Sequence, residues 1–98
     1  MYPSAVKIVP VRMADGELHS LGGGAEASLV LLNNSARGYS IQWLNFKGQL
    51  IDYGTLEPMS YRVMQTYVRH AWALKNTASG RINQFVVDAP AARWRVDN

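Results

Sequence analysis

The side chains with the greatest chemical potential lie in one central stretch of the sequence: Trp43, Tyr53, Thr66, His70 and Trp72. Indole and phenol rings provide apolar walls, and a neutral imidazole and a hydroxyl can together donate and accept hydrogen bonds. If neighbouring strands bring these groups together, they form a small aromatic box that contains two polar groups. Such a box suits a compact apolar ring that carries one hydroxyl.

Catalytic patterns are absent from the sequence. It contains no Gly-x-Ser-x-Gly elbow, no His-Glu-x-x-His and no paired acids on a common element. His19 lies near Glu17, but a metal site would need further ligands, and a chain without cysteine has no thiolate to offer. We therefore expect no enzyme, no metal and no cofactor.

Composition describes an ordinary folded chain. The 98 residues are 48% hydrophobic and 17% charged, which predicts one domain over residues 1–98. The net charge of +3 is dispersed, so we expect no nucleic-acid partner, and no apolar run is long enough for a membrane helix. The oligomeric state stays open, as does the compartment, with the cytoplasm slightly favoured because no signal peptide is recognisable.

Turn signals recur at short spacing and separate segments rich in valine, leucine, isoleucine and aromatic residues, a pattern typical of an all-β sandwich or barrel. We predict six strands, over Lys7–Arg12, Ser28–Asn33, Tyr39–Phe46, Tyr61–Tyr67, His70–Asn76 and Arg81–Asp88. The tail after Pro90 forms either a last short strand or a frayed end, with Trp94 packed against the core.

Strand parity indicates which sheet face carries each of the two polar residues, Thr66 and His70. Residues two apart share a face, so Thr66 lies opposite Gln65 in its strand. If residues 68–69 make a tight hairpin, Thr66 and His70 can lie on the same sheet surface. Parity alone leaves open whether Trp43 meets them.

Four spaced motifs carry a family resemblance: Asn33-x-Ser35-x-Arg37, Trp43-Leu44-Asn45-Phe46-x-Gly48, Tyr53-x-Thr55-Leu56-x-Pro58 and Tyr67-x-x-His70-x-Trp72. Over about residues 18–90 the chain resembles the β-domain of the von Hippel–Lindau tumour suppressor family. The resemblance implies a small β-sandwich of about six to eight strands, with residues 91–98 as a C-terminal tail.

The family is known for recognising 4-hydroxyproline in a peptide of the hypoxia-inducible factor α chain. By resemblance, Trp43, Tyr53 and Trp72 would surround the pyrrolidine ring. His70 and Thr66 would bind its hydroxyl, with Thr66 standing where the family has a serine. The implied function is a non-catalytic module that binds a hydroxyproline-containing peptide or protein.

The resemblance also implies where the rest of the peptide lies. The backbone of Gln65, with Met64 and Tyr67 around it, would line the strand edge along which the peptide extends. Tyr53 would contact the peptide backbone through its phenol. Gly54 lies beside the pocket, at a position where the family has a proline that forms a rigid wall.

Other positions depart from the family. Gly22 and Gly24 replace an asparagine and an arginine that help hold the peptide, and Lys47 replaces an acid. The family's helical domain, which binds elongin C, has no counterpart in these residues, so no elongin C partner is expected. A rival hypothesis is a structural or protein-interaction β-sandwich that keeps the fold but does not read hydroxyproline.

Overall fold

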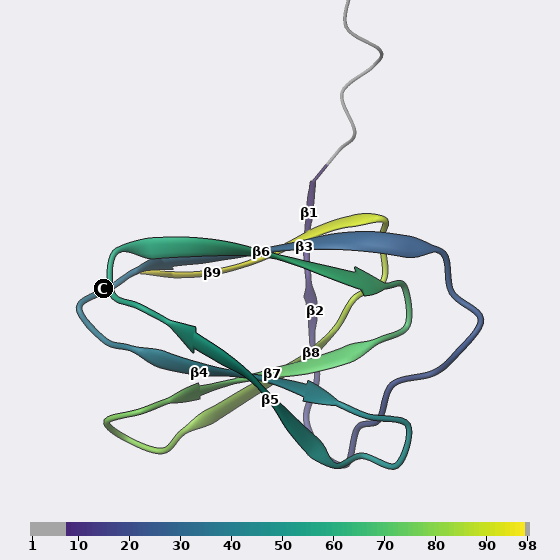
Figure 1. Ribbon diagram of the computed structural model, residues 1–98, viewed down its shortest axis with the longest axis horizontal. Coiled ribbons are helices and arrows are strands. Elements are labelled where there is room, and N and C mark those ends of the chain that lie inside the picture. The colour runs from purple at the N-terminus through teal and green to yellow at the C-terminus, as the bar shows by residue number, and fades with distance from the viewer. Residues whose placement is uncertain (1–7, 98) are drawn as a thin grey trace, which may run out of the picture.

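A computed structural model describes residues 8–97, and this part of the chain contains nine strands and no helix. The strands are β1 (Val9–Pro10), β2 (Arg12–Met13), β3 (Glu26–Asn34), β4 (Tyr39–Leu44), β5 (Leu50–Leu56), β6 (Ser60–Tyr67), β7 (Ala71–Asn76), β8 (Ile82–Val86) and β9 (Ala91–Asp97). They form two facing sheets, with strand orders β1-β9-β3-β6 and β2-β8-β7-β4-β5 (Figure 1). The predicted all-β sandwich is confirmed. Within the described residues, no helix exists that could cross a membrane.

Alternation of side chains builds the core between the sheets. In β3, Ala27, Leu29 and Leu31 are buried, while Ser28 is exposed and Val30 only partly covered. This period of two is what a strand with one buried face requires. The opposite sheet supplies further buried side chains, among them Ile41, Leu56, Trp72, Leu74 and Phe85.

Strand β7 occupies the centre of the second sheet and is buried on both faces. Trp72 and Leu74 point into the main core, as parity predicts. Ala71 and Ala73 form a second cluster on the outer face, covered by Leu18 from the segment that precedes β3. The small alanine side chains let this segment approach the sheet closely, and it then runs towards the turn between β6 and β7.

The first predicted strand is divided. Lys7 lies outside the described residues, and the rest splits at Val11 into β1 and β2. β1 pairs in parallel with β9 in one sheet, and β2 pairs antiparallel with β8 in the other. The N-terminal segment therefore crosses from layer to layer at one side of the sandwich (Figure 1).

Two further strands lie outside the predicted ranges. β5 was not predicted at all, and the tail forms β9, which pairs in parallel with β3. Trp94 is only 6% exposed and packs edge-on against Tyr39, which confirms its predicted place in the core. The division of the first strand and these additions explain why nine strands are seen.

The condition under which Thr66 and His70 could share a sheet surface, a hairpin between β6 and β7, is not met. A tight turn does form, closed by a hydrogen bond from the His70 amide to the Tyr67 carbonyl (3.1 Å), but it connects different sheets. Arg69 takes a φ of 80° in this turn. Thr66 therefore faces Trp72 across the core and does not share a sheet surface with His70.

Candidate functional site

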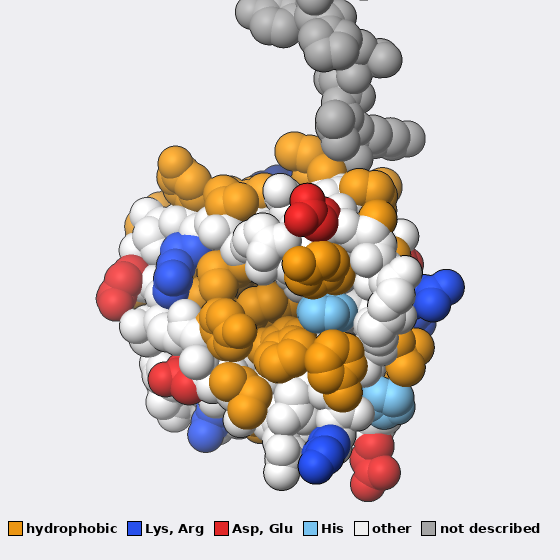
Figure 2. Space-filling model, turned by 45° about the vertical axis from the view of Figure 1, so that its right-hand side comes forward, with side chains coloured by type: hydrophobic (Ala, Val, Ile, Leu, Met, Phe, Trp, Pro, Cys, Tyr) orange, Lys and Arg blue, Asp and Glu red, His pale blue; other side chains and the backbone are white. Residues whose placement is uncertain are grey.

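The structure brings all five predicted box residues together at one end of the sandwich. Trp43 comes from β4, Tyr53 from β5, Thr66 from β6, His70 from the β6–β7 turn and Trp72 from β7. Ring centroids lie 5.2 Å apart for Tyr53 and Trp72, 6.4 Å for Trp43 and Tyr53, and 5.4 Å for Trp43 and His70. Figure 2 shows hydrophobic side chains gathered around a histidine on this end.

Each polar member of the box is bonded to an indole. Trp72 Nε1 donates to Thr66 Oγ1 (2.9 Å), and Trp43 Nε1 donates to His70 Nδ1 (3.2 Å). Thr66 Oγ1 and His70 Nδ1 lie 3.5 Å apart. Because Nδ1 accepts, the neutral imidazole carries its proton on Nε2. Within the described residues, His70 Nε2–H and the second lone pair of Thr66 Oγ1 have no other partner, so together they can both donate to and accept from one hydroxyl.

Burial distinguishes the floor of the box from its mouth. Thr66 and Trp72 are each 2% exposed, whereas Tyr53 is 45% exposed and Phe46 is 56% exposed. Tyr53 stands edge-on over Trp72, so the box is closed by its own side chains. Because Thr66 is 2% exposed, a ligand can reach it only if neighbouring side chains move, an adjustment that is common when interfaces form.

Burial also lowers the pKa of His70 below its ordinary value of 6.5. Protonation would in addition place a hydrogen on Nδ1, where it faces the indole N–H of Trp43. His70 is therefore held neutral, which is the state in which it can both accept from Trp43 and donate from Nε2.

This shift predicts a pH dependence of stability. In the folded state the pKa of His70 lies below 6.5, so the unfolded chain binds the additional proton first as the pH falls. The stabilisation should be complete above about pH 6.5 and should be lost as the pH falls through the folded-state pKa. Urea denaturation at a series of pH values, with wild type and His70→Gln compared, measures this contribution. Identical pH dependence of the two proteins would contradict it.

Tyr53 is presented by a β-bulge. Ser40 pairs with Thr55 and Gln42 pairs with Asp52, so β5 carries one extra residue at this point. Bulges bend a strand locally and redirect a side chain. Gly54, within the bulge, has a φ of 104°, far from the −65° or so that a proline imposes. A proline at this position, as the resemblance implies for the family, would thus be incompatible with the backbone seen here.

Arg62 from the other sheet secures the bulge. Its Nη1 donates to the carbonyls of Tyr53 and Thr55, at 3.3 Å each. A Cβ at Gly54 would lie 2.8 Å from this nitrogen, so the missing side chain gives the guanidinium its place. The arginine links the edge strands β5 and β6 and holds the backbone on both sides of Gly54.

Sequence reasoning missed two residues that shape the site. Phe46 contacts Trp43 and His70, with ring centroids at 5.6 and 5.7 Å, and lies in a turn because β4 ends at Leu44 instead of Phe46. The Lys47–Gly48 turn signal was the available hint. The second missed residue is Ser20, for which the sequence pattern gives no comparable hint.

Ser20 joins the strands that carry the box. Its Oγ donates to the Leu44 carbonyl (2.5 Å) and accepts from the Ala71 amide (2.9 Å), and the residue is 1% exposed. These partners are the direct chain neighbours of Trp43 and His70. Ser20 therefore fixes the end of β4 relative to the start of β7, and with it the spacing of the indole and the imidazole.

Three of the expected peptide-flanking residues, Met64, Gln65 and Tyr67, lie on β6, an edge strand of the first sheet, while Gly54 lies on β5. The Ser28 amide bonds to the Pro90 carbonyl, so the backbone groups of Ser28 point away from β6. Those of its register partner Gln65 accordingly point away from β3, to the free edge. Gln65 and Tyr67 are exposed, whereas Met64 is buried in the core.

The polar motif that begins at Asn33 stabilises the fold. Asn33 is fully buried, and its Nδ2 donates to the carbonyls of Arg37 (2.7 Å) and Glu57 (3.0 Å), while its Oδ1 accepts from the Ser35 hydroxyl (2.6 Å). These bonds satisfy a polar side chain in the interior and join the β3–β4 corner to the end of β5. Over residues 8–97, no three histidine or acidic side chains are grouped so as to hold a metal ion.

Comparison with known protein families gives one finding. A family model described as the VHL beta domain matches residues 18–87. This range covers more than half of the chain, spans β3 to β8 and contains all five box residues. No curated protein matches the chain.

Proposed function

The chain belongs to the VHL β-domain family, and from that premise we propose that it is a non-catalytic module that binds 4-hydroxyproline in an extended segment of another protein. The observation that carries the proposal is the pair of indole hydrogen bonds, which orient Thr66 and His70 towards each other and fix one neutral form of the imidazole. No cofactor takes part in this recognition.

The polar pair supports discrimination between hydroxyproline and proline. The ring hydroxyl can accept from His70 Nε2–H and donate to the free lone pair of Thr66. Unmodified proline would bury these groups without partners, at about 1–3 kcal/mol for each. A site of this kind binds the analogue that lacks the hydroxyl about tens-fold more weakly, or weaker still.

The free edge of β6 supports binding of an extended chain. Strand addition to a sheet edge supplies main-chain hydrogen bonds, while pockets beside the edge select side chains. Gln65 offers its backbone groups at this edge, and the exposed Tyr67 contacts His70 with ring centroids at 5.2 Å. In the proposed complex the peptide follows β6 and places its modified ring between Trp43 and Tyr53.

One observation favours the rival, a β-sandwich that binds partners without reading hydroxyproline. Trp72 is a member of the main core cluster and Thr66 is almost fully buried, so their hydrogen bond also stabilises the fold. The two functions differ in one respect. Only a hydroxyproline reader loses affinity when the ring hydroxyl is removed from the ligand.

Calorimetric titration with two short peptides that differ only in one hydroxyproline or proline tests the proposal. We expect the hydroxylated peptide to bind about tenfold more tightly or better. His70→Ala should remove this preference, because it deletes the donor at Nε2. Lys75→Ala, an exposed position on β7, should leave it intact. Equal binding of both peptides by the wild type would overturn the proposal and favour the rival.

A further inference from the structure

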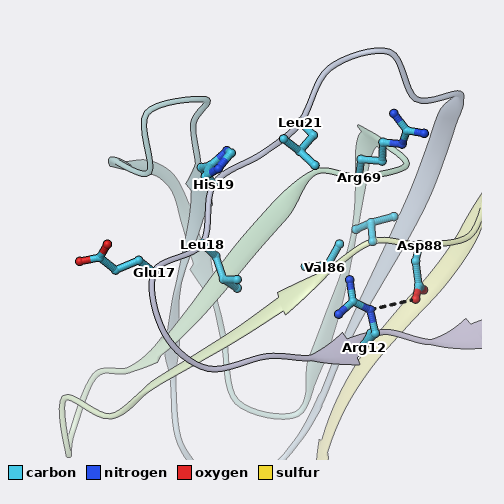
Figure 3. A pocket seen from close by; sticks show the side chains of 9 residues that line it. Arg12, Glu17, Leu18, His19, Leu21, Arg69, Val86 and Asp88 are labelled. Carbon is cyan, nitrogen blue, oxygen red and sulfur yellow. Dashed lines mark ion pairs between the residues drawn. The ribbon is translucent and has the colours of Figure 1, made fainter.

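A cavity of about 350 Å³ lies next to the aromatic box. Arg69 lines this cavity, and the next residue along the turn, His70, belongs to the box. The other walls come from β2, from the segment before the glycine-rich loop (Gly22–Gly24) and from the end of β8 (Figure 3). Two recognition surfaces therefore meet at consecutive residues.

The cavity has an apolar floor and a cation at its rim. Leu18, Leu21 and Val86 supply the apolar surface, and Figure 3 shows them between the charged side chains. The charge of Arg12 is balanced by Asp88, at 3.4 Å. Within the described residues Arg69 makes no ion pair.

Glu17, the other acid in the lining, points away from the centre of the cavity, and Arg69 lies at the opposite end (Figure 3). Arg12 and Asp88, which Figure 3 shows on the same side as Arg69, neutralise each other, so Arg69 carries the unbalanced charge at this end. An acidic group is favoured at the end that adjoins the box and disfavoured at the far end.

The backbone of Arg69 is unusual and firmly held. Its φ of 80° is a conformation that glycine adopts freely and other residues adopt at a cost. Its amide donates to the Val87 carbonyl (2.7 Å), and its carbonyl accepts from the Leu21 amide (3.0 Å). An arginine in a strained conformation, with its backbone fixed on both sides, favours a functional role for this side chain.

We propose that this cavity receives an apolar side chain of the bound peptide, with a neighbouring acidic residue of the same peptide placed at Arg69. The occupant is a peptide because the box and the cavity share the β6–β7 turn, so a chain with its ring in the box reaches Arg69 next. The proposal rests on the proposed function, and it names the sequence that would flank the hydroxyproline.

Arg69→Gly gives a sharp test, since glycine relieves the backbone strain and removes the cation together with its aliphatic stem, and Arg69→Lys is the control that keeps a cation. Hydroxyproline peptides with Leu-Glu, Leu-Lys or Ala-Glu beside the modified residue, on either side, serve as probes in calorimetry. The wild type should bind the Leu-Glu peptide about two- to fivefold more tightly than the Leu-Lys peptide, as an exposed ion pair allows. This difference should disappear in Arg69→Gly, persist in Arg69→Lys and shrink at high salt.

Methyl and amide NMR shifts of Leu21 and Val86 separate this inference from the proposed function. If the proline version of the Leu-Glu peptide shifts these signals, and Arg69→Gly weakens that response, the cavity binds the flank even if the box does not prefer hydroxyproline. If the signals of Leu21 and Val86 do not respond to any peptide, or respond equally to Leu-Glu and Leu-Lys, the inference is overturned.

Discussion

Replacing Thr66 with valine is expected to abolish the preference for hydroxyproline and to lower the free energy of unfolding by about 1–3 kcal/mol. Valine has nearly the same shape but no hydroxyl, so the Trp72 indole N–H loses its acceptor in a site that is 2% exposed. The same substitution removes one of the two groups that would bind the ring hydroxyl. Urea denaturation and paired peptide titrations measure the two effects on one protein.

Two control variants show whether the effects of Thr66→Val come from loss of the Thr66 hydroxyl. Thr66→Ser keeps the hydroxyl, so it should retain both the hydrogen bond from Trp72 and the hydroxyproline preference. Thr77→Val removes a threonine hydroxyl at an exposed position that bonds to the Gly38 carbonyl, and it should change neither quantity much. A Thr66→Val protein that still prefers the hydroxylated peptide would exclude Thr66 from recognition. One with unchanged stability would show that the Trp72 hydrogen bond contributes little.

The composition of the box could be predicted because it depends on residue types at family spacing. The geometry that joins the residues could not. A hairpin over residues 68–69 could have placed Thr66 and His70 on one sheet surface, but the turn instead connects β6 of one sheet to β7 of the other. A tight turn of the same length serves either connection, and positive φ values occur in tight hairpins as well, so the local residue pattern does not distinguish them.

Strand β5 escaped prediction for a related reason. Its segment contains Asp52 and Gly54, two residues that are depleted in strands. Most of its side chains are exposed because it is an edge strand, so the alternation that revealed β3 is missing. The bulge at Gly54 breaks the remaining period. The irregular part of the sheet is also the part that presents Tyr53.

The hydrogen bonds that fix the site come largely from outside the recognised motifs. Ser20 lies far from β4 and β7 in the sequence, yet its hydroxyl joins them. Arg62 lies within the predicted strand Tyr61–Tyr67, and its side chain crosses to the other sheet to hold the bulge. Long-range contacts of single polar residues leave no periodic signal, so these positioning roles become visible only in three dimensions.

The second large expected effect is a loss of stability when Gly24 in the glycine-rich loop is replaced. Gly24→Ala is expected to destabilise the protein by about 3 kcal/mol or more, the upper range for an added group in a packed site. An added Cβ would lie 1.9 Å from the carbonyl oxygen of Val68 and 2.7 Å from its carbonyl carbon. Both atoms are backbone, so the loop or the β6–β7 turn has to move. Urea denaturation gives the loss of stability.

Gly22→Ala is the matched control, because an added Cβ there has no neighbour within 4 Å. It should leave stability nearly unchanged. The contrast rests on the packing of the bare Gly24 backbone against Val68, whose amide bonds to the Ala25 carbonyl (2.8 Å). Displacement of that contact moves the turn that carries Arg69 and His70, so Gly24→Ala should weaken peptide binding as well. Equal stability of the two alanine variants would mean that the turn is free to shift, and the positions of Arg69 and His70 would then not depend on this contact.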